Sequence, residues 1–204
     1  MSELHKALGD ISSIRRQMAQ STQFRGYGPA TLAATGCIGF LAAAAQSIWL
    51  PNPANHLSAY LRIWMVTAVL SAAITGVQMV TRTRRIHSGF SNEMLRMAVE
   101  QFLPAPLAGV LITWVLVHYA WSVLWILPGL WQVIFGLGIF SSCRFLPRPI
   151  MAAGVWYLAT GLLCLSLGDE RAFAPWTMGL AFGIGQLLIA GILLFASPEV
   201  EDEA

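Results

Sequence analysis

Six long apolar runs alternate with short polar segments along the chain. The runs cover residues 29–50, 59–81, 103–121, 123–143, 150–168 and 175–197. Each has about the 20 mostly apolar residues that a helix needs to cross the hydrocarbon core of a bilayer. The sequence therefore predicts an all-α membrane protein whose six transmembrane helices form one domain over residues 29–197. The third and fourth runs are divided by length alone, near His118 to Ser122.

Two polar segments show the periodicity of amphipathic helices. Residues 1–28 carry apolar side chains at spacings of three and four, namely Leu4, Ala7, Ile11, Ile14 and Met18. This pattern predicts a cytoplasmic N-terminal helix that lies in the headgroup layer, pairs with a second copy or docks on a partner. Residues 82–102 predict a cytoplasmic elbow in which Ser91 caps a short interfacial helix. An acidic tail follows at residues 198–204.

The composition excludes an ordinary soluble domain. Hydrophobic residues make up 56% of the 204 and charged residues only 11%, against about 25% charged in soluble domains. The mean hydropathy is +0.64. A net charge of +2 gives no reason to expect a nucleic-acid partner. The expected partners are the lipid bilayer, further copies in a homo-oligomer, or the other subunits of a membrane complex.

The positions of the basic residues predict the orientation. Only Arg62 and Arg171 of the 12 basic residues fall in segments that would be outside if the N-terminus is cytoplasmic. This bias predicts a multi-pass protein of the bacterial cytoplasmic (inner) membrane with both termini in the cytoplasm. Three arginines, Arg82, Arg84 and Arg85, form a juxtamembrane cluster suited to anionic lipid headgroups.

The membrane core offers neutral polar groups and no charge. No Asp, Glu, Lys or Arg lies in the middle of a predicted span, which argues against proton relays, voltage sensors and most ion-coupled transporters. The polar or amphipathic side chains at depth are Gln132, Gln186, Trp131, Thr113, Ser71 and Thr160. They predict either hydrogen bonds between helices or the lining of a small cavity for a neutral ligand.

Catalytic and metal-binding motifs are absent from the sequence. It contains no H-E-x-x-H, G-x-S-x-G or Walker loop, so we expect no enzymatic activity. His56 and His118 are both predicted on the outer side, but they have no cysteine or carboxylate companions. We therefore expect no metal and no cofactor.

Glycines mark faces where helices can approach closely. They are Gly179, Gly183, Gly185 and Gly191 in the last span and Gly129, Gly136 and Gly138 in the fourth, and Gly179 and Gly183 form a G-x-x-x-G pair. Such residues predict tight helix packing, within one chain or between copies.

A short proline motif occurs three times, as W-L-P-N-P at 49–53, F-L-P-A-P at 102–106 and F-L-P-R-P at 145–149. Superposing the first on the third places spans one to three on spans four to six with inverted topology. The order of the motifs thus predicts an inverted 3+3 repeat, as in many transporters. The alternative is that prolines and aromatics simply mark helix ends at the membrane interface.

Several stretches together resemble a group of uncharacterised bacterial six-span membrane proteins. They are I-R-R-Q-M-A-Q-S-T-Q-F, L-P-G-L-W-Q-V-I-F-G-L-G-I, P-R-P-I-M-A-A-G and P-W-T-M-G-L-A-F-G-I-G-Q. The residues that carry the resemblance are Ile14, Arg15, Met18, Ser21, Phe24, Pro128, Gly129, Trp131, Gly136, Gly138, Pro149, Met151 and Gly154. In that group a histidine often stands at the position of Gln186, and the genes often neighbour winged-helix regulators. The resemblance implies six spans and no particular activity.

Three functions follow from these observations, in decreasing order of support. The first is a non-enzymatic membrane protein that binds or translocates a small neutral or apolar molecule. The second is a structural or accessory subunit of a larger membrane complex. The third is an intramembrane enzyme.

Overall fold

The computed structural model describes residues 28–85, 97, 100–143 and 148–195, without the side chains of 82–85 and 148. Within these ranges all regular structure is helical. The long helices are α2 (Pro29–Trp49), α3 (Leu57–Arg85), α5 (Pro104–Tyr119), α6 (Leu127–Ser142), α7 (Met151–Ser166) and α8 (Pro175–Phe195). The short 3-10 helices are η1 (Pro53–His56), η2 (Trp121–Ile126), η4 (Arg148–Ile150) and η5 (Glu170–Phe173).

Five helical segments are long and apolar enough to cross a membrane. They are Pro29–Trp49, Pro53–Thr81, Glu100–Tyr119, Trp121–Ser142 and Pro175–Phe195. The sixth, α7, is equally apolar but has 16 residues, or about 24 Å at 1.5 Å per residue. These helices are consistent with an integral membrane protein, and they begin and end within a few residues of the ranges predicted from hydropathy.

Prolines lie at the helix starts. Pro29, Pro53, Pro104 and Pro128 each occupy one of the first two positions of a helix, where the missing N–H costs no hydrogen bond. In W-L-P-N-P, α2 ends at Trp49 and η1 begins at Pro53, whereas F-L-P-A-P opens α5. Most of F-L-P-R-P lies outside the described residues, as do the predicted N-terminal helix, most of the elbow and the acidic tail.

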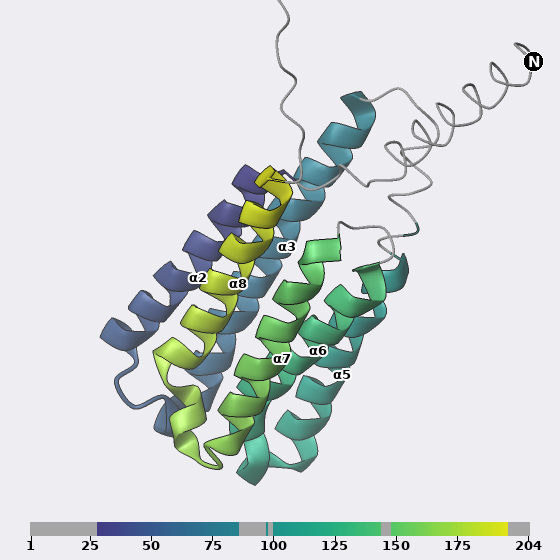
Figure 1. Cartoon of the computed structure of the whole chain (residues 1–204). Helices are drawn as coiled ribbons and strands as arrows, with labels where there is room; N and C mark the ends of the chain where they lie inside the picture. Colours follow the sequence, from purple (N-terminus) through teal and green to yellow (C-terminus); the bar gives the residue numbers. More distant parts are fainter. Residues whose placement is uncertain (1–27, 86–96, 98–99, 144–147, 196–204) are drawn as a thin grey trace, which may run out of the picture.

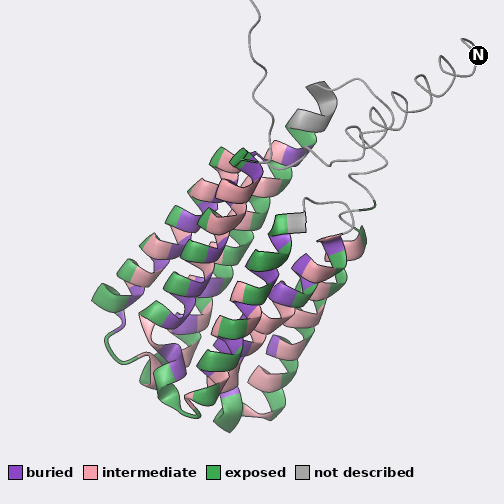
Figure 2. Cartoon of the chain, in the orientation of Figure 1, coloured by how far each residue is buried: buried purple, intermediate pink, exposed green. Residues whose placement is uncertain are grey.

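The long helices lie side by side, and successive ones run in opposite directions (Figure 1). Extensive packing joins α3 to α2, α2 to α8, α8 to α7, α7 to α6 and α6 to α5. Buried residues follow α2, α6, α7 and α8 (Figure 2). Only Thr113 is buried among the residues of α5. The protein interior is therefore built mainly by four helices, with α3 and α5 more exposed.

The packing does not establish an internal repeat. The close pair α6–α7 lies within the second set of three spans, but the close pair α2–α8 joins the first set to the second. The inverted 3+3 repeat and the six-span topology therefore stay predictions.

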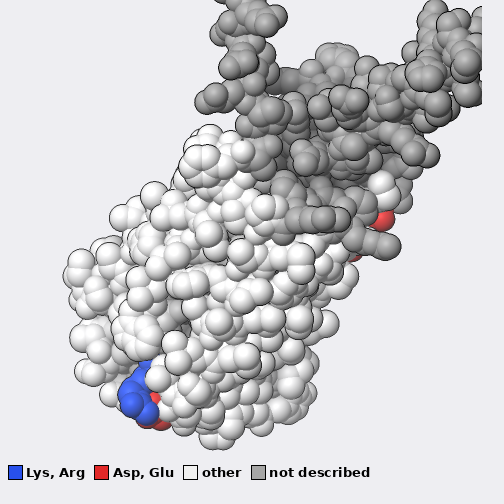
Figure 3. Space-filling view, in the orientation of Figure 1, with Lys and Arg blue, Asp and Glu red and all other residues white. Residues whose placement is uncertain are grey.

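The described surface is nearly free of charge. In the view of Figure 3, the charged residues that are described lie only towards the two ends of the helices. This distribution is expected when the middle of each helix lies in hydrocarbon.

Candidate functional site

Gln132 is the most enclosed polar side chain of the predicted set. It lies on α6, has no exposed surface, and its Nε2 donates a hydrogen bond to the carbonyl oxygen of Thr177 at 3.1 Å. The same nitrogen is 3.9 Å from the sulfur of Met178. Its Oε1 is buried and accepts no hydrogen bond from the described residues. Gln132 therefore places one open acceptor between α6 and the start of α8.

Trp131 and Thr113 belong to the same predicted set, and the structure joins them by a hydrogen bond. The Trp131 Nε1 donates to Thr113 Oγ1 at 2.8 Å, and the Thr113 hydroxyl donates to the Gly109 carbonyl at 2.7 Å. This chain connects α6 to α5, on a different side of α6 from the bond between Gln132 and Thr177. The Trp131 indole N–H and the Thr113 hydroxyl thus both have hydrogen-bond partners. This agrees with the alternative in which polar side chains at depth form hydrogen bonds between helices.

Gln186 lies between α8 and α2. Its Oε1 is 3.5 Å from the hydroxyl of Thr35, which also donates to the Leu32 carbonyl at 2.8 Å. Gln186 is only partly buried. It therefore belongs to a different helix pair from Gln132.

Ser71 and Thr160 make no side-chain hydrogen bond to another helix among the described residues. The Thr160 hydroxyl donates to the Trp156 carbonyl at 2.9 Å, on its own helix. Ser71 is partly buried on α3, and its carbonyl accepts from Thr75 Oγ1 at 2.8 Å. The six predicted residues thus do not converge on one point, and a cavity lined by all of them stays a prediction.

An aromatic cluster fills the space where α6, α7 and α8 meet. Phe135, Tyr157 and Phe182 have ring centroids 4.8, 5.2 and 5.4 Å apart. Phe135 lies one turn along α6 from Gln132, and Phe182 lies one turn along α8 from Gln186. We call these three residues the aromatic layer. It separates the level of Gln132 from the level of Gln186.

The hydroxyl of Tyr157 is a second open polar group. The side chain has no exposed surface, and its hydroxyl comes near Gln186 without the geometry of a hydrogen bond. The phenol ring lies against Gly185, where any Cβ would collide with it. The third buried group without a partner among the described residues is the hydroxyl of Tyr60.

Sequence reasoning missed Gln46. This residue of α2 is fully buried, and both ends of its amide are paired. Its Nε2 donates to the Phe173 carbonyl at 2.7 Å, and its Oε1 accepts from Trp64 Nε1 at 2.8 Å. Gln46 thereby joins α2, α3 and η5. Gln46 lies near the end of a predicted span, where a polar residue is unremarkable, so its position in the sequence did not single it out.

Six of the seven predicted packing glycines lie at helix contacts, and the exception is Gly191, where a Cβ would meet nothing within 4 Å. A Cβ on Gly179 would lie 2.5 Å from the Cβ of Ala43, and one on Gly183 would collide with the ring of Phe40. On α6, a Cβ on Gly136 would lie 3.1 Å from the Gly154 carbonyl oxygen of α7, and one on Gly138 would lie 2.8 Å from the Cβ of Ala105. These glycines therefore pack against helices of the same chain.

The side chains of Arg82, Arg84 and Arg85 lie outside the described residues, so their role at lipid headgroups stays a prediction.

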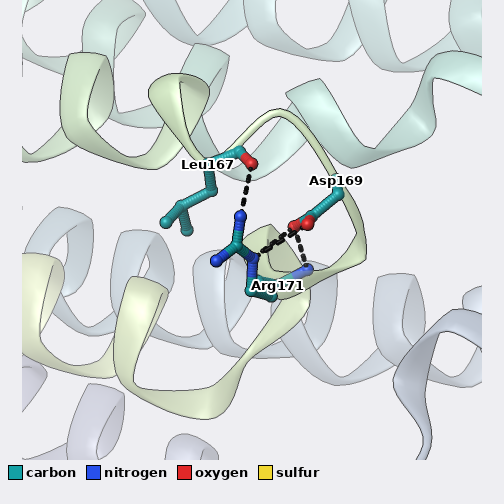
Figure 4. Close-up of polar contacts among 3 residues, drawn as sticks. All are labelled: Leu167, Asp169 and Arg171. Carbon is teal, nitrogen blue, oxygen red and sulfur yellow. Dashed lines mark hydrogen bonds and ion pairs between the residues drawn. The ribbon is translucent and has the colours of Figure 1, made fainter.

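The loop between α7 and α8 holds an exposed ion pair (Figure 4). Arg171 Nε donates to both carboxylate oxygens of Asp169, at 2.9 and 2.8 Å, and Arg171 Nη2 donates to the Leu167 carbonyl at 3.1 Å. The Arg171 backbone N–H also donates to Asp169 Oδ1 at 2.9 Å. These hydrogen bonds hold the pKa of Asp169 below its ordinary value, because they favour the ionised carboxylate.

The chemistry available inside the bundle is neutral hydrogen bonding. Within the described ranges, no three His, Cys, Asp or Glu side chains are grouped so that they could hold a metal ion. The open groups are the Gln132 oxygen and the hydroxyls of Tyr157 and Tyr60. An amide oxygen can accept from a ligand, and a phenol can donate or accept.

No protein-family model, no curated protein and no solved structure matches this chain.

Proposed function

We propose that the chain is a six-span integral protein of the bacterial inner membrane, with both termini in the cytoplasm. The apolar helices and the distribution of basic residues along the sequence support this topology. The short helix α7 is included as a span because it packs between α6 and α8 and runs antiparallel to both (Figure 1). Membership of the bacterial six-span group is part of the same proposal.

Within this topology, the protein binds a small neutral molecule that donates a hydrogen bond to Gln132 Oε1. A single observation carries the proposal, namely that this oxygen is fully buried and has no hydrogen-bond partner among the described residues. An acceptor left without a partner in a protein interior costs about 1–3 kcal/mol. A bound donor would recover that free energy.

The aromatic layer favours binding over translocation. Phe135, Tyr157 and Phe182 lie in contact between the levels of Gln132 and Gln186. A polar molecule that passed from one glutamine to the other would have to displace these rings. We therefore assign the Gln132 acceptor to a binding site on one side of the layer.

A density map of the full chain, purified in native-membrane nanodiscs, tests the proposal. We expect a density feature within hydrogen-bonding distance of Gln132 Oε1, and native mass spectrometry should detect the corresponding adduct. The variant Q132M should lose both, whereas the control T160V, whose hydroxyl bonds only within α7, should keep both. A dry Gln132 oxygen, with unchanged adducts in Q132M, would refute the proposal.

The alternative is an accessory subunit of a membrane complex. The observation in its favour is the exposure of large apolar side chains along α5, including Leu107, Leu111 and Trp114. Lipid can cover such a face, but so can another subunit. Purification at native expression level distinguishes them, because a lone small species argues for lipid. A co-purifying membrane protein that shields α5 from a lipid-phase photolabel argues for the subunit.

A further inference from the structure

A shallow, open groove runs between α2 and α3. Its volume is about 510 Å³. One wall is a stripe of α2 that includes Ile38, Leu41 and Ala45, and the other is formed by Ile63, Val66 and Leu70 of α3. The α2 residues recur at spacings of three and four, so they lie on one face of the helix. The groove exists because alanines stand in the middle of that face between larger side chains.

The groove is apolar along its length and charged at one end. The hydroxyl of Thr67, which also lines it, donates to the Ile63 carbonyl at 2.8 Å and needs no ligand. Arg62 is the only charged lining residue, and Trp49 lies at the same end. Arg62 Nε reaches back one turn, towards the start of α3, to the Ser58 carbonyl at 3.3 Å. The guanidinium therefore points to the end of the bundle where an interface would lie.

The length of the groove matches one leaflet of a bilayer. From Ile38 to Trp49 the α2 face covers a rise of about 16 Å, at 1.5 Å per residue. Half of a hydrocarbon core of about 30 Å is about 15 Å. The groove has a cation and a tryptophan at one end and hydrocarbon side chains along the rest. This order matches a phospholipid, whose charged headgroup is followed by an apolar acyl chain.

We propose that this groove binds one acyl chain of an anionic phospholipid and that Arg62 binds its phosphate. Arg62 makes no ion pair with a described residue, so its charge is available to the lipid. No described carboxylate lies within ion-pair distance of the Arg62 guanidinium. This arrangement favours a negatively charged headgroup over a zwitterionic one.

The contrast with Arg171 strengthens the assignment. Arg171 lies in the loop before α8, towards the same end of the bundle, and already holds Asp169 through two bonds of 2.9 and 2.8 Å. A charge neutralised in this way attracts a phosphate less than a free one. The two arginines therefore form a matched pair of variants for the test.

Native mass spectrometry of the full chain in detergent, titrated with dioleoyl phosphatidylglycerol or dioleoyl phosphatidylcholine, tests the proposal. We expect the wild type to prefer phosphatidylglycerol, and R62Q to bind it about tenfold more weakly, as for the loss of one charge-assisted contact. R62K should recover most of the affinity, and R171Q should behave as the wild type. The variant A45L should weaken both lipids by filling the groove.

Three outcomes would overturn the proposal. R62Q and R171Q could lower lipid binding equally, which would indicate a general effect of charge. The wild type could bind both lipids alike, with no loss in R62Q. A map in nanodiscs could show a second copy of the chain over the groove instead of an acyl chain. Because R62Q and R62K alter an exposed side chain, the test does not depend on the folding of A45L.

Discussion

Two glutamines with no exposed surface lie in different parts of the bundle, and their amides have different partners. Gln46 pairs both ends of its amide, with Trp64 Nε1 at 2.8 Å and the Phe173 carbonyl at 2.7 Å. Gln132 pairs only its nitrogen, with the Thr177 carbonyl at 3.1 Å. The first connects three elements of the fold, whereas the second connects two and leaves an acceptor open.

The difference separates a structural polar group from a candidate binding group. A buried amide in an apolar interior costs free energy unless its donors and acceptors are paired. Full pairing explains why Gln46 can be retained for stability alone. Gln132 is only partly paired, so stability alone does not explain why this glutamine is buried. The proposed ligand would supply the missing partner of its amide oxygen.

The largest effect is expected from Q46L. This change leaves the Trp64 indole N–H and the Phe173 carbonyl without partners in a buried place. We expect a loss of about 3 kcal/mol in the free energy of unfolding, from two buried groups left unpaired. Unfolding in mixed micelles, followed by tryptophan fluorescence, measures it.

A double-mutant cycle with W64F provides the control. Because W64F removes the N–H that Q46L would strand, the loss in Q46L/W64F should be smaller than the sum of the two single losses. Additive losses would mean that the bond between Gln46 and Trp64 contributes nothing, and the contrast between the two glutamines would fail.

The next effect is expected from G129A, which alters the contact of α6 with α7 one turn from Gln132. A Cβ on Gly129 would lie 2.8 Å from the Gly161 carbonyl oxygen, which is backbone and cannot move aside as a side chain can. We expect a loss of about 2 kcal/mol, as for overpacking of a tight contact. Thermal unfolding of the purified protein measures it.

Gly191 supplies the matched control on α8, since a Cβ there meets nothing within 4 Å. G191A should be neutral or stabilising by up to about 1 kcal/mol, because alanine favours a helix over glycine. Equal losses in G129A and G191A would show that helix contact is not the cause.

A smaller effect is expected from Y157F. The hydroxyl has no hydrogen-bond partner among the described residues, and phenylalanine keeps the ring contacts with Phe135 and Phe182. We expect the unfolding free energy to change by less than about 0.5 kcal/mol, since no hydrogen bond within the protein is lost. A clear loss in the same assay would mean that the hydroxyl is paired, with Gln186 or with a bound molecule, and the same loss in a Q186L background would assign it to a bound molecule.

The sequence predicted the helices well because their limits depend on local composition. The apolar runs mark the helices without knowledge of the partners, and the structure places prolines 29, 53, 104 and 128 at helix starts. The orientation of those helices in a membrane and the inverted repeat stay predictions.

The relations between side chains on different helices could not be read from the sequence. Gln132 and Gln186 were expected either to form hydrogen bonds between helices or to line one cavity, and the sequence did not show that they lie at different levels, on either side of the aromatic layer. Their placement depends on how each helix is rotated. That rotation is set by contacts between distant segments. One example is Gly36 of α2, where a Cβ would lie only 3.0 Å from the carbonyl oxygen of Gly183 on α8. Hydropathy carries no information on such pairs.

The smallest effect is expected from D169N, outside the helical core. The pKa of Asp169 is held low in the folded protein, mainly by the hydrogen bond from the Arg171 side chain. The stability that this ion pair contributes is therefore fully present above the unfolded-state pKa of the carboxyl and is lost as the pH falls through the lower, folded-state pKa.

D169N keeps an oxygen that can accept from the Arg171 N–H but removes the charge. Between neutral and strongly acidic pH, the Tm of the wild type should therefore fall slightly more than the Tm of D169N. This difference between the two proteins should shrink in high salt, because both side chains are exposed. Identical acid profiles would show that the pair shapes the loop without stabilising it, and a large gap would mean that the loop before α8 supports the interior polar network around Gln46 through η5.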